Sequence, residues 1–398
     1  MFTTETFVIV GASLVGDTAA QVLRAEGFDG RIVLLGAEPH RPHEVPGLRK
    51  VYFAGTSSPA GAEVRLDATV TSLDRVAREV VLDDGERIAY DRLLLATGPE
   101  PRRLSGPGGE ADGGPRRLED GAQIRDAFRA GPRVAIIGAD WIGLEAAAAA
   151  RCAGLEVTVL DPADLPVLRV RGRRSAAAFA QVHREHGADL RVGVQVARPA
   201  GAGALPGVEL GDGSFVAADL VLVAAGVTAV MALAADAGLD LTGARAGEHL
   251  HTADPAVFVA GDVDCARPGR HAVVDTWEDS RQRAAGAARS MLGQDVALDR
   301  GPYVFAGGLD VATEHVAPAE VVRSDRVVLR GDAGRREFVG FWPTDGRLLA
   351  GIDVNVWEVV GAVTNLVASG RRAHPTRAPR HAASAVLGPL LAAVFAGS

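Results

Sequence analysis

Short runs of consecutive apolar residues recur along the chain, and each of two such runs leads directly into a glycine. Phe7–Val10 precedes Gly11, and Val134–Ile137 precedes Gly138. Runs of this length, rich in β-branched side chains and free of polar interruption, are typical of strands buried on both faces of a parallel sheet. An alanine-rich stretch of helical character follows each glycine and ends near a further glycine. The pattern predicts two α/β units.

Each unit contains a turn of the form G-x-x-x-x-G between its first strand and its helix, and an acid after its second strand. The acids are Glu38, 22 positions after Gly16, and Asp161, 18 positions after Gly143. An acid about 20 residues beyond such a turn is placed to bind a ribose hydroxyl of a dinucleotide. A single turn is weak evidence, because a tight corner in an unrelated α/β protein needs the same glycines. Two such turns, each with its strands and acid, predict a pair of dinucleotide-binding units.

Three later apolar runs also end in glycine, at Gly98, Gly226 and Gly261. Ligands of open parallel sheets bind at the carboxyl ends of the strands. Asp262, which follows the third of these glycines, is therefore a candidate hydrogen-bond acceptor, although a solvated turn aspartate is the alternative.

The predicted fold class is α/β, with two Rossmann-like dinucleotide-binding domains and a small α+β C-terminal domain. The first domain takes residues 1–110 and resumes at 245–298, the second takes 111–244, and the third takes 299–398. The stretch 105–115 is rich in glycine and proline and is predicted to be the crossing linker.

Composition narrows the class of protein. The chain has 398 residues, of which 47% are hydrophobic, so it can form two or three domains with sizeable cores. Its formal net charge of −8 argues against nucleic-acid binding. No apolar run approaches the ~20 residues that span a bilayer, so no membrane segment is expected. The apolar tail 384–398 is interpreted as a packing segment, or as a contact of a homodimer.

The two cysteines, Cys152 and Cys265, lie far apart and form no C-x-x-C motif. A dithiol relay of the disulfide-reductase kind is therefore not expected. This sparse use of cysteine, together with the lack of a signal peptide in residues 1–11, predicts a cytoplasmic location.

Taken together, the motifs resemble those of FAD-dependent ferredoxin reductases, the oxygenase-coupled type that serves cytochromes P450 and aromatic-ring dioxygenases. The resemblance extends over nearly the whole chain and rests on "VIVGASLVG", "LLGAEPHRPHE", "LLLATG", "IIGADWIGLE", "VFVAGDV", "DTWEDS" and "GIDVNVWEV". Each motif alone is unspecific, but the set is specific. The resemblance implies an oxidoreductase that passes electrons from NADH through flavin to a 2Fe–2S ferredoxin or an oxygenase component.

The resemblance also implies which residues bind FAD in the first unit. They are Gly11, Ser13, Leu14, Val15, Gly16, Glu38, Lys50, Val70, Ala96, Thr97, Gly98, Gly261, Asp262 and Trp277. Lys50 and Trp277 are implied to be catalytic as well; the cation of Lys50, near the ring, is implied to stabilise negative charge on reduced flavin.

The second unit is implied to bind NADH. The residues concerned are Gly138, Asp140, Ile142, Gly143, Asp161 and Gly226. Glu145 is implied to be catalytic and to face the nicotinamide pocket, although an ordinary glutamate on a helix surface is the alternative. Asp161 indicates a ribose 2′-hydroxyl rather than a 2′-phosphate, because like charges repel. The arginine-rich segment 168–174 has three interpretations: a site for a 2′-phosphate, a docking surface for an acidic ferredoxin, or a solvated loop.

Three stretches depart from the family pattern. Asp140 stands where the turn normally has its middle glycine, and a carboxylate ~4 Å from a phosphate costs roughly 1 kcal/mol per charge pair even in water. Val45 replaces an arginine and Gly47 a proline, and "FAGG" at 305–308 replaces larger and polar residues beside the flavin. These departures leave an alternative open. It is a pseudo-reductase that keeps the fold, has lost effective nicotinamide use, and serves as a non-reductase catalyst or a binding partner.

Overall fold

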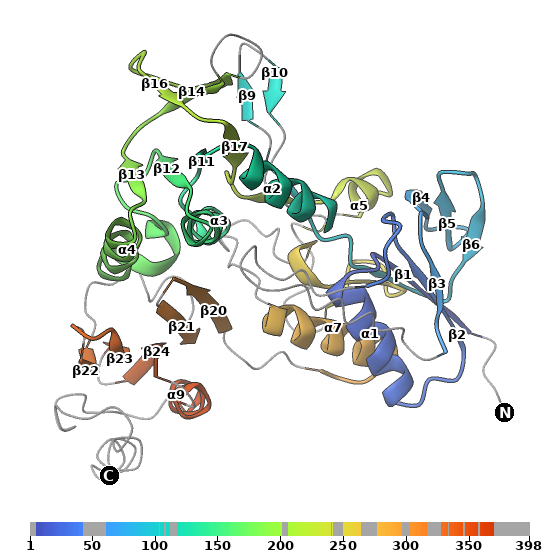
Figure 1. Ribbon diagram of the computed structural model, residues 1–398. Helices are drawn as coiled ribbons and strands as arrows, with labels where there is room; N and C mark the ends of the chain where they lie inside the picture. The colour runs from blue at the N-terminus through green and yellow to red at the C-terminus, as the bar shows by residue number, and fades with distance from the viewer. Residues whose placement is uncertain are drawn as a thin grey trace, which may run out of the picture. The chain divides into compact units, whose positions relative to one another are not determined.

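The computed structural model is a mixed α/β structure with two compact units (Figure 1). The first unit comprises Met1–Val45, Val51–Glu100 and Thr228–Arg300, and the second comprises Pro46–Lys50, Pro101–Val227 and Gly301–Ser398. The residues that the structure describes are 5–42, 61–102, 104–106, 109–111, 118–200, 206–239, 241, 250–263, 277–296, 303–309, 311–316, 328–332, 334–344, 347–356 and 359–369. Within the described residues, the chain passes between the units at β8 (Pro99–Pro101) and β18 (Val227–Ala229).

The first unit is built on a parallel sheet with strand order β19-β7-β1-β2-β3. Its strands are β1 (Thr6–Val10), β2 (Arg31–Leu35), β3 (Glu63–Arg65), β7 (Arg92–Leu95) and β19 (Val257–Val259). Residues 7–10 of β1 are all buried. The expectation of a parallel strand buried on both faces is therefore confirmed.

Alternate residues of these strands enter two different cores. Phe7 and Ile9 pack with the helices, whereas Val8 and Val10 pack with a second, antiparallel sheet. The helices are α1 (Leu14–Ala25) and α7 (Trp277–Met291), which lie side by side in Figure 1. The opposite face is covered by β4 (Val70–Asp74), β5 (Glu79–Leu82), β6 (Arg87–Ala89) and α5 (Ala232–Asp236).

The second unit repeats this arrangement around a parallel sheet with strand order β13-β12-β11-β17. The strands are β11 (Arg133–Ile137), β12 (Glu156–Asp161), β13 (Asp189–Val192) and β17 (Leu220–Val223). Val134 and Ile136 pack with the helices α2 (Leu118–Ala130), α3 (Trp141–Cys152) and α4 (Leu168–Glu185). Ala135 and Ile137 pack with the antiparallel strands β14 (Val196–Ala200), β15 (Gly207–Leu210) and β16 (Phe215–Ala217). A hairpin of β9 (Leu104–Gly106) and β10 (Gly109–Ala111) belongs to the same unit.

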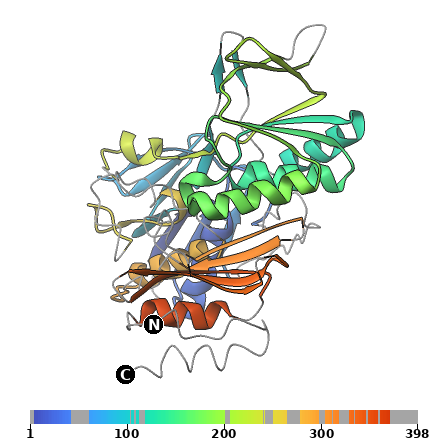
Figure 2. The same ribbon diagram turned by 90° about the vertical axis from the view of Figure 1, so that its left-hand side faces the viewer.

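The C-terminal region, which was predicted to be a small α+β domain, contains an antiparallel sheet with strand order β20-β21-β24-β23-β22. Its elements are β20 (Tyr303–Gly308), β21 (Val311–Val316), β22 (Val328–Asp332), β23 (Glu337–Thr344), β24 (Arg347–Val354) and α9 (Val360–Ala368). Figure 2 shows α9, in red, beneath this sheet. Val182 of α4 enters the core of the sheet, and Glu185 pairs with Arg336. The structure groups this sheet with the second nucleotide-type fold in one compact unit, and the boundaries expected for three domains remain a prediction.

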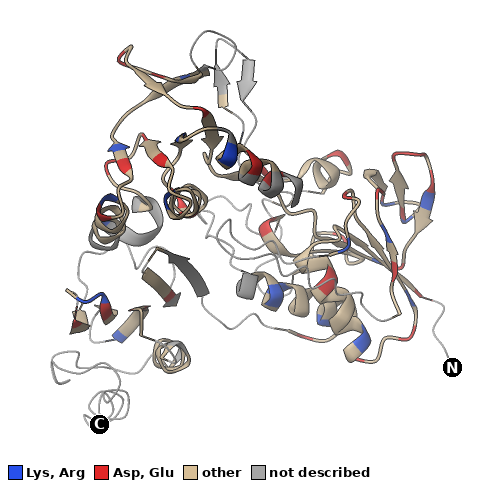
Figure 3. Cartoon of the chain, in the orientation of Figure 1, with Lys and Arg blue, Asp and Glu red and all other residues tan. Residues whose placement is uncertain are grey.

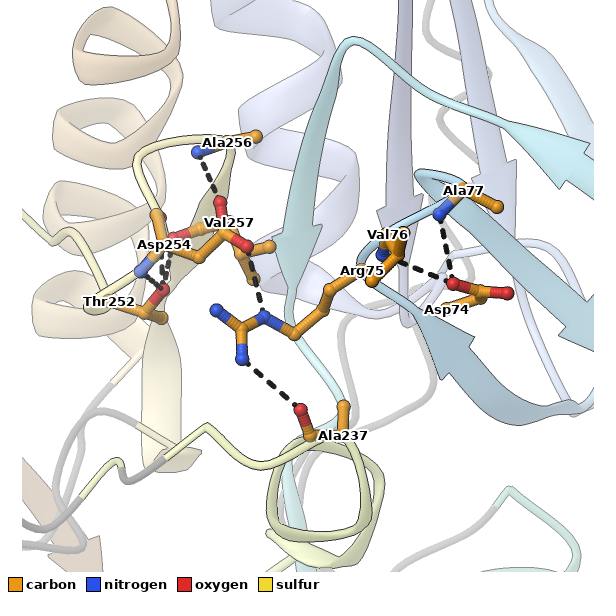
Figure 4. A network of polar contacts seen from close by, with 9 residues as sticks. All are labelled: Asp74, Arg75, Val76, Ala77, Ala237, Thr252, Asp254, Ala256 and Val257. Carbon is orange, nitrogen blue, oxygen red and sulfur yellow. Dashed lines mark hydrogen bonds and ion pairs between the residues drawn. The ribbon is translucent and has the colours of Figure 1, made fainter.

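A polar network holds together segments of the first unit that are distant in sequence (Figure 4). Arg75 donates from Nε to Asp254 Oδ2 at 3.0 Å and from Nη1 to the carbonyl of Ala237 at 3.3 Å. Burial raises the pKa of the nearby Tyr90 to about 12, and the negative charge of Asp254 adds to the shift. The network ties the β4–β5 hairpin to the stretch that leads into β19, one of the strands of the candidate site.

Charged side chains of both signs are interspersed along the elements of each unit (Figure 3). Within the described part of the chain, no helix is long and apolar enough to cross a bilayer.

Candidate dinucleotide-binding sites

The first glycine turn follows β1 and has a shape that only glycine allows. Gly11 has φ 116° and donates its N–H to Leu35 O at 2.8 Å. An added Cβ on Gly11 would lie 2.1 Å from Ala96 O, and one on Gly16 would lie 2.0 Å from Gly11 O. Side chains are excluded at both positions, so the backbone itself forms the surface of the turn.

The turn leads into the N-terminus of α1, which is suited to bind an anion. Ser13 is the N-cap residue with an extended backbone, and its side chain makes no capping hydrogen bond. The first N–H groups of a helix lack intrahelical partners, and the helix dipole favours negative charge there. Ser13, Leu14 and Val15 are therefore placed as the binding of a dinucleotide diphosphate requires.

Asp17, in the first turn of α1, lies next to the predicted diphosphate-binding turn and was not singled out from the sequence. Its side chain is buried, and Oδ2 accepts a hydrogen bond from Gln21 Nε2 at 2.7 Å. An acidic residue next to the predicted diphosphate site is unexpected, as is Asp140 in the second unit. The signal was available in the sequence, because Asp17 directly follows Gly16 in the apolar "LVGDTAAQVL".

The carboxyl ends of three neighbouring strands bring the other predicted FAD residues to one edge of the first sheet. β1 ends before Gly11, β7 before Ala96, Thr97 and Gly98, and β19 before Gly261 and Asp262. The last two residues lie in the short 3-10 helix η1 (Gly261–Val263).

Positive φ angles of 67° at Gly98 and 81° at Gly261 let the chain turn at this edge. Thr97 Oγ1 donates to Val230 O at 3.1 Å, which fixes the strand end. Glu38 is half-buried and follows the end of β2 by three residues. These residues fit an extended dinucleotide such as FAD, laid across the ends of parallel strands.

Other predicted FAD residues are not brought to this edge by the described structure. Val70 begins β4 and packs against the core under the antiparallel sheet. Trp277 begins α7, and its side chain lies outside the described residues, as do Lys50, Val45 and Gly47.

The second glycine turn has the same backbone hydrogen bond and the same close contacts as the first. Gly138 has φ 109° and donates its N–H to Leu160 O at 2.8 Å. An added Cβ on Gly138 would lie 2.1 Å from Ala224 O, and one on Gly143 would lie 2.0 Å from Gly138 O. The internal repeat inferred from the sequence therefore extends to the contacts that make glycine necessary.

Asp140 is the N-cap residue of α3, with φ −79° and ψ −175°, and its carboxylate makes no capping hydrogen bond. The side chain is exposed, and the carbonyl accepts from Leu144 N at 2.9 Å. Because φ is negative, the fold does not need glycine at this middle position, so a carboxylate is tolerated. It stands where the diphosphate of a second dinucleotide is expected.

Further along the second unit, Ile142 and Glu145 are both half-buried on α3. Gly226 follows β17 with φ 90°, and its carbonyl accepts from Arg102 N at 3.0 Å. The buried His183 of α4 places its ring nitrogens 2.9 Å from Phe179 O and 3.1 Å from Leu144 O, and burial lowers its pKa. This histidine links α4 to the helix that carries the second turn.

The departure at 305–308 lies in β20, whose backbone is an unbroken strand. Gly307 lies opposite Ala312, and Gly308 lies opposite Val311. The small residues therefore leave the strand pairing intact, and what their side chains contact lies outside the described residues.

Comparison with known proteins identifies the family. The family model for pyridine nucleotide-disulphide oxidoreductases matches residues 5–288. The ferredoxin–NAD(+) reductase component of the anthranilate 1,2-dioxygenase system of Burkholderia cepacia is 34% identical over 394 residues, which cover 93% of this chain and 96% of the relative. The chain belongs to this family.

Solved structures place it in the ferredoxin reductase branch. A covalent putidaredoxin reductase–putidaredoxin complex matches with a TM-score of 0.81 and 28% identity over 94% of this chain and 95% of the other. A ferredoxin reductase of the CYP199A2 system of Rhodopseudomonas palustris matches with a TM-score of 0.78 and 30% identity, covering 88% and 91%. The two dinucleotide-binding folds and the FAD-dependent oxidoreductase class are thereby confirmed, with FAD and NADH as the cofactors of the family.

The pseudo-reductase alternative finds no support in these comparisons. The family description mentions disulphides, but this chain lacks a C-x-x-C motif. Cys152 is exposed at the end of α3, and Cys265 lies outside the described residues.

Proposed function

We propose that this protein is the reductase component of an oxygenase system, which oxidises NADH and delivers single electrons to a 2Fe–2S ferredoxin. The observation that carries the proposal is the pair of glycine turns with matching contacts, set in a chain whose dioxygenase-system relative is similar over nearly its whole length. Bound FAD supplies the conversion of a hydride into two single electrons. A cytoplasmic location is proposed with it, on the sparse cysteine usage.

The residues of the chain bind and orient in this proposal. The first turn and the amides at the start of α1 hold the diphosphate of FAD, and Asp262 accepts a hydrogen bond from its ribityl chain. Glu38 binds the adenosine ribose. The second turn holds NADH, with Glu145 beside the nicotinamide. Lys50 and Trp277 are proposed to lie near the flavin ring, where the cation of Lys50 stabilises the reduced form.

The test of this function is a coupled assay with the purified full chain. We expect the protein to be yellow, to release FAD on denaturation, and to reduce a 2Fe–2S ferredoxin with NADH under anaerobic conditions. With cytochrome c added as the final electron acceptor, omitting the ferredoxin should lower the rate of cytochrome c reduction sharply. A colourless protein that gains no flavin absorbance with excess FAD would contradict the proposal.

We expect NADH to be preferred over NADPH. Asp161 ends β12, and its charge opposes a 2′-phosphate held at the adenosine ribose. The measurement is kcat/KM for each nucleotide with the same ferredoxin. A clear preference for NADPH would show that the arginines of 169–174, rather than Asp161, govern recognition at the ribose.

A further inference from the structure

The carboxylate of Asp161 is already engaged by the backbone around the second turn. Oδ2 accepts from the N–H of Ala139 at 2.6 Å, and Oδ1 accepts from the N–H of Ala163 at 2.7 Å. Ala139 is the second residue of the glycine turn and is fully buried. The acid therefore joins the turn to the connection between β12 and α4 through both of its oxygens.

The carbonyl group of Ala139 is also bound by the connection between β12 and α4. This carbonyl accepts from Val167 N at 2.9 Å. Val167 is 2% exposed and has φ 46°, a left-handed conformation that is unfavourable for a β-branched residue. The main chain of Asp161 is fixed too, because its carbonyl accepts from Val194 N at 3.1 Å.

In the first unit, the position that corresponds to Asp161 is occupied by a glycine, which has no side chain to form such a brace. In each unit the first glycine of the turn donates to a residue near the end of the second strand, Leu35 in one and Leu160 in the other. The next residue is Gly36 in the first unit and Asp161 in the second. An added Cβ on Gly36 would lie 2.6 Å from the Cβ of Ala12, so a side chain does not fit there.

It follows that the two acids do not occupy equivalent positions. Glu38 is the third residue after Leu35, whereas Asp161 is the first after Leu160. The position of Glu38 is held in the second unit by Ala163, whose N–H binds Asp161. Asp161 thus bonds directly to its turn from the position that Gly36 occupies in the first unit.

We propose that Asp161 is a positioning residue that holds the second glycine turn in its dinucleotide-binding shape before any nucleotide arrives. The identity of the nucleotide rests on the proposed function, but the brace does not. An ionised carboxylate has about four acceptor sites, so two backbone amides leave capacity for a ribose hydroxyl. In this proposal the acid holds the turn and keeps an acceptor site for the ligand.

Asp161→Asn weakens the brace, because an amide has one oxygen and must turn its NH2 group toward one of the two backbone donors. A buried N–H that loses its acceptor opens more readily, by roughly tenfold or more. We expect amide hydrogen exchange in the peptide covering residues 138–143 to rise about tenfold in the nucleotide-free, FAD-loaded protein. We also expect the Kd for NAD+, which binds without turnover, to rise about tenfold.

The matched control is Asp164→Asn, which removes one negative charge from the same connection. The Asp164 side chain is 75% exposed, and its carboxylate lies 4.0 Å from Arg173. Exchange at 138–143 should be unchanged in this variant. Asp161→Ala is the second test variant and should raise the exchange further, since it offers neither amide an acceptor.

Unchanged exchange at 138–143 in both Asp161 variants would overturn the proposal, even if NAD+ binding weakened, because Asp161 would then act on the ligand alone. If the proposed use of NADH is wrong, NAD+ binding is absent in wild type, but the exchange result still decides the role of Asp161.

Discussion

Gly11→Ala is expected to prevent FAD binding. The new Cβ would lie 2.1 Å from Ala96 O in a backbone with φ 116°, so the turn must move away from the end of β7. Left-handed strain and the steric overlap together cost on the order of 4 kcal/mol. If the turn relieves this strain only in the FAD-free protein, that energy corresponds to about a thousandfold loss of affinity for FAD. The measurement is bound FAD per chain after gel filtration, with far-UV circular dichroism to establish that the variant is folded.

Gly27→Ala is the matched control for this prediction. Gly27 follows the other end of α1 and has φ 89°, but an added Cβ would meet no heavy atom within 4 Å. It should lower stability by about 1–2 kcal/mol through backbone strain and leave FAD binding intact. Full FAD content in Gly11→Ala would show that the cofactor does not lie over the first turn.

Asp140→Gly is expected to tighten NADH binding by about a hundredfold, which corresponds to ~2.7 kcal/mol. The Asp140 carboxylate is exposed at the N-terminus of α3 and is not used as a helix cap. A negative charge at a helix N-terminus stabilises the nucleotide-free fold by ~0.3–1 kcal/mol, but it repels phosphates that bind there. Removing it relieves the repulsion and lets the backbone approach the diphosphate. The measurement is anaerobic titration with NADH, following flavin bleaching.

Asp140→Asn separates charge from size. If repulsion dominates, the asparagine variant should recover most of the gain in affinity, and if steric hindrance dominates it should recover little. Wild-type affinity in both variants would show that the carboxylate points away from the phosphates and has no effect on NADH.

Much of the fold was predictable from the sequence because its signals are local. Buried β-branched runs predicted β1 and β11, and the glycines at 11, 16, 138 and 143 predicted turns whose close contacts exclude any side chain. The small C-terminal domain was predicted from a change of periodicity, and its antiparallel sheet was found.

What the sequence did not predict depends on register and on long-range packing. The spacings of Glu38 and Asp161 from their turns made the two acids look equivalent, because the ends of strands cannot be located to within two residues from the sequence alone. Only the pairing of β11 with β12 places Asp161 directly after the last paired position. The packing of α4 against the C-terminal sheet through Val182 had no local signal either.

Anaerobic stopped-flow reduction of the purified protein shows whether this chain passes electrons from NADH to a flavin held on its first turn. We predict that excess NADH bleaches the flavin absorbance completely, at a slow rate in wild type and faster in Asp140→Gly. A flavin that stays oxidised with NADH in both proteins, while dithionite bleaches it, would contradict the claim.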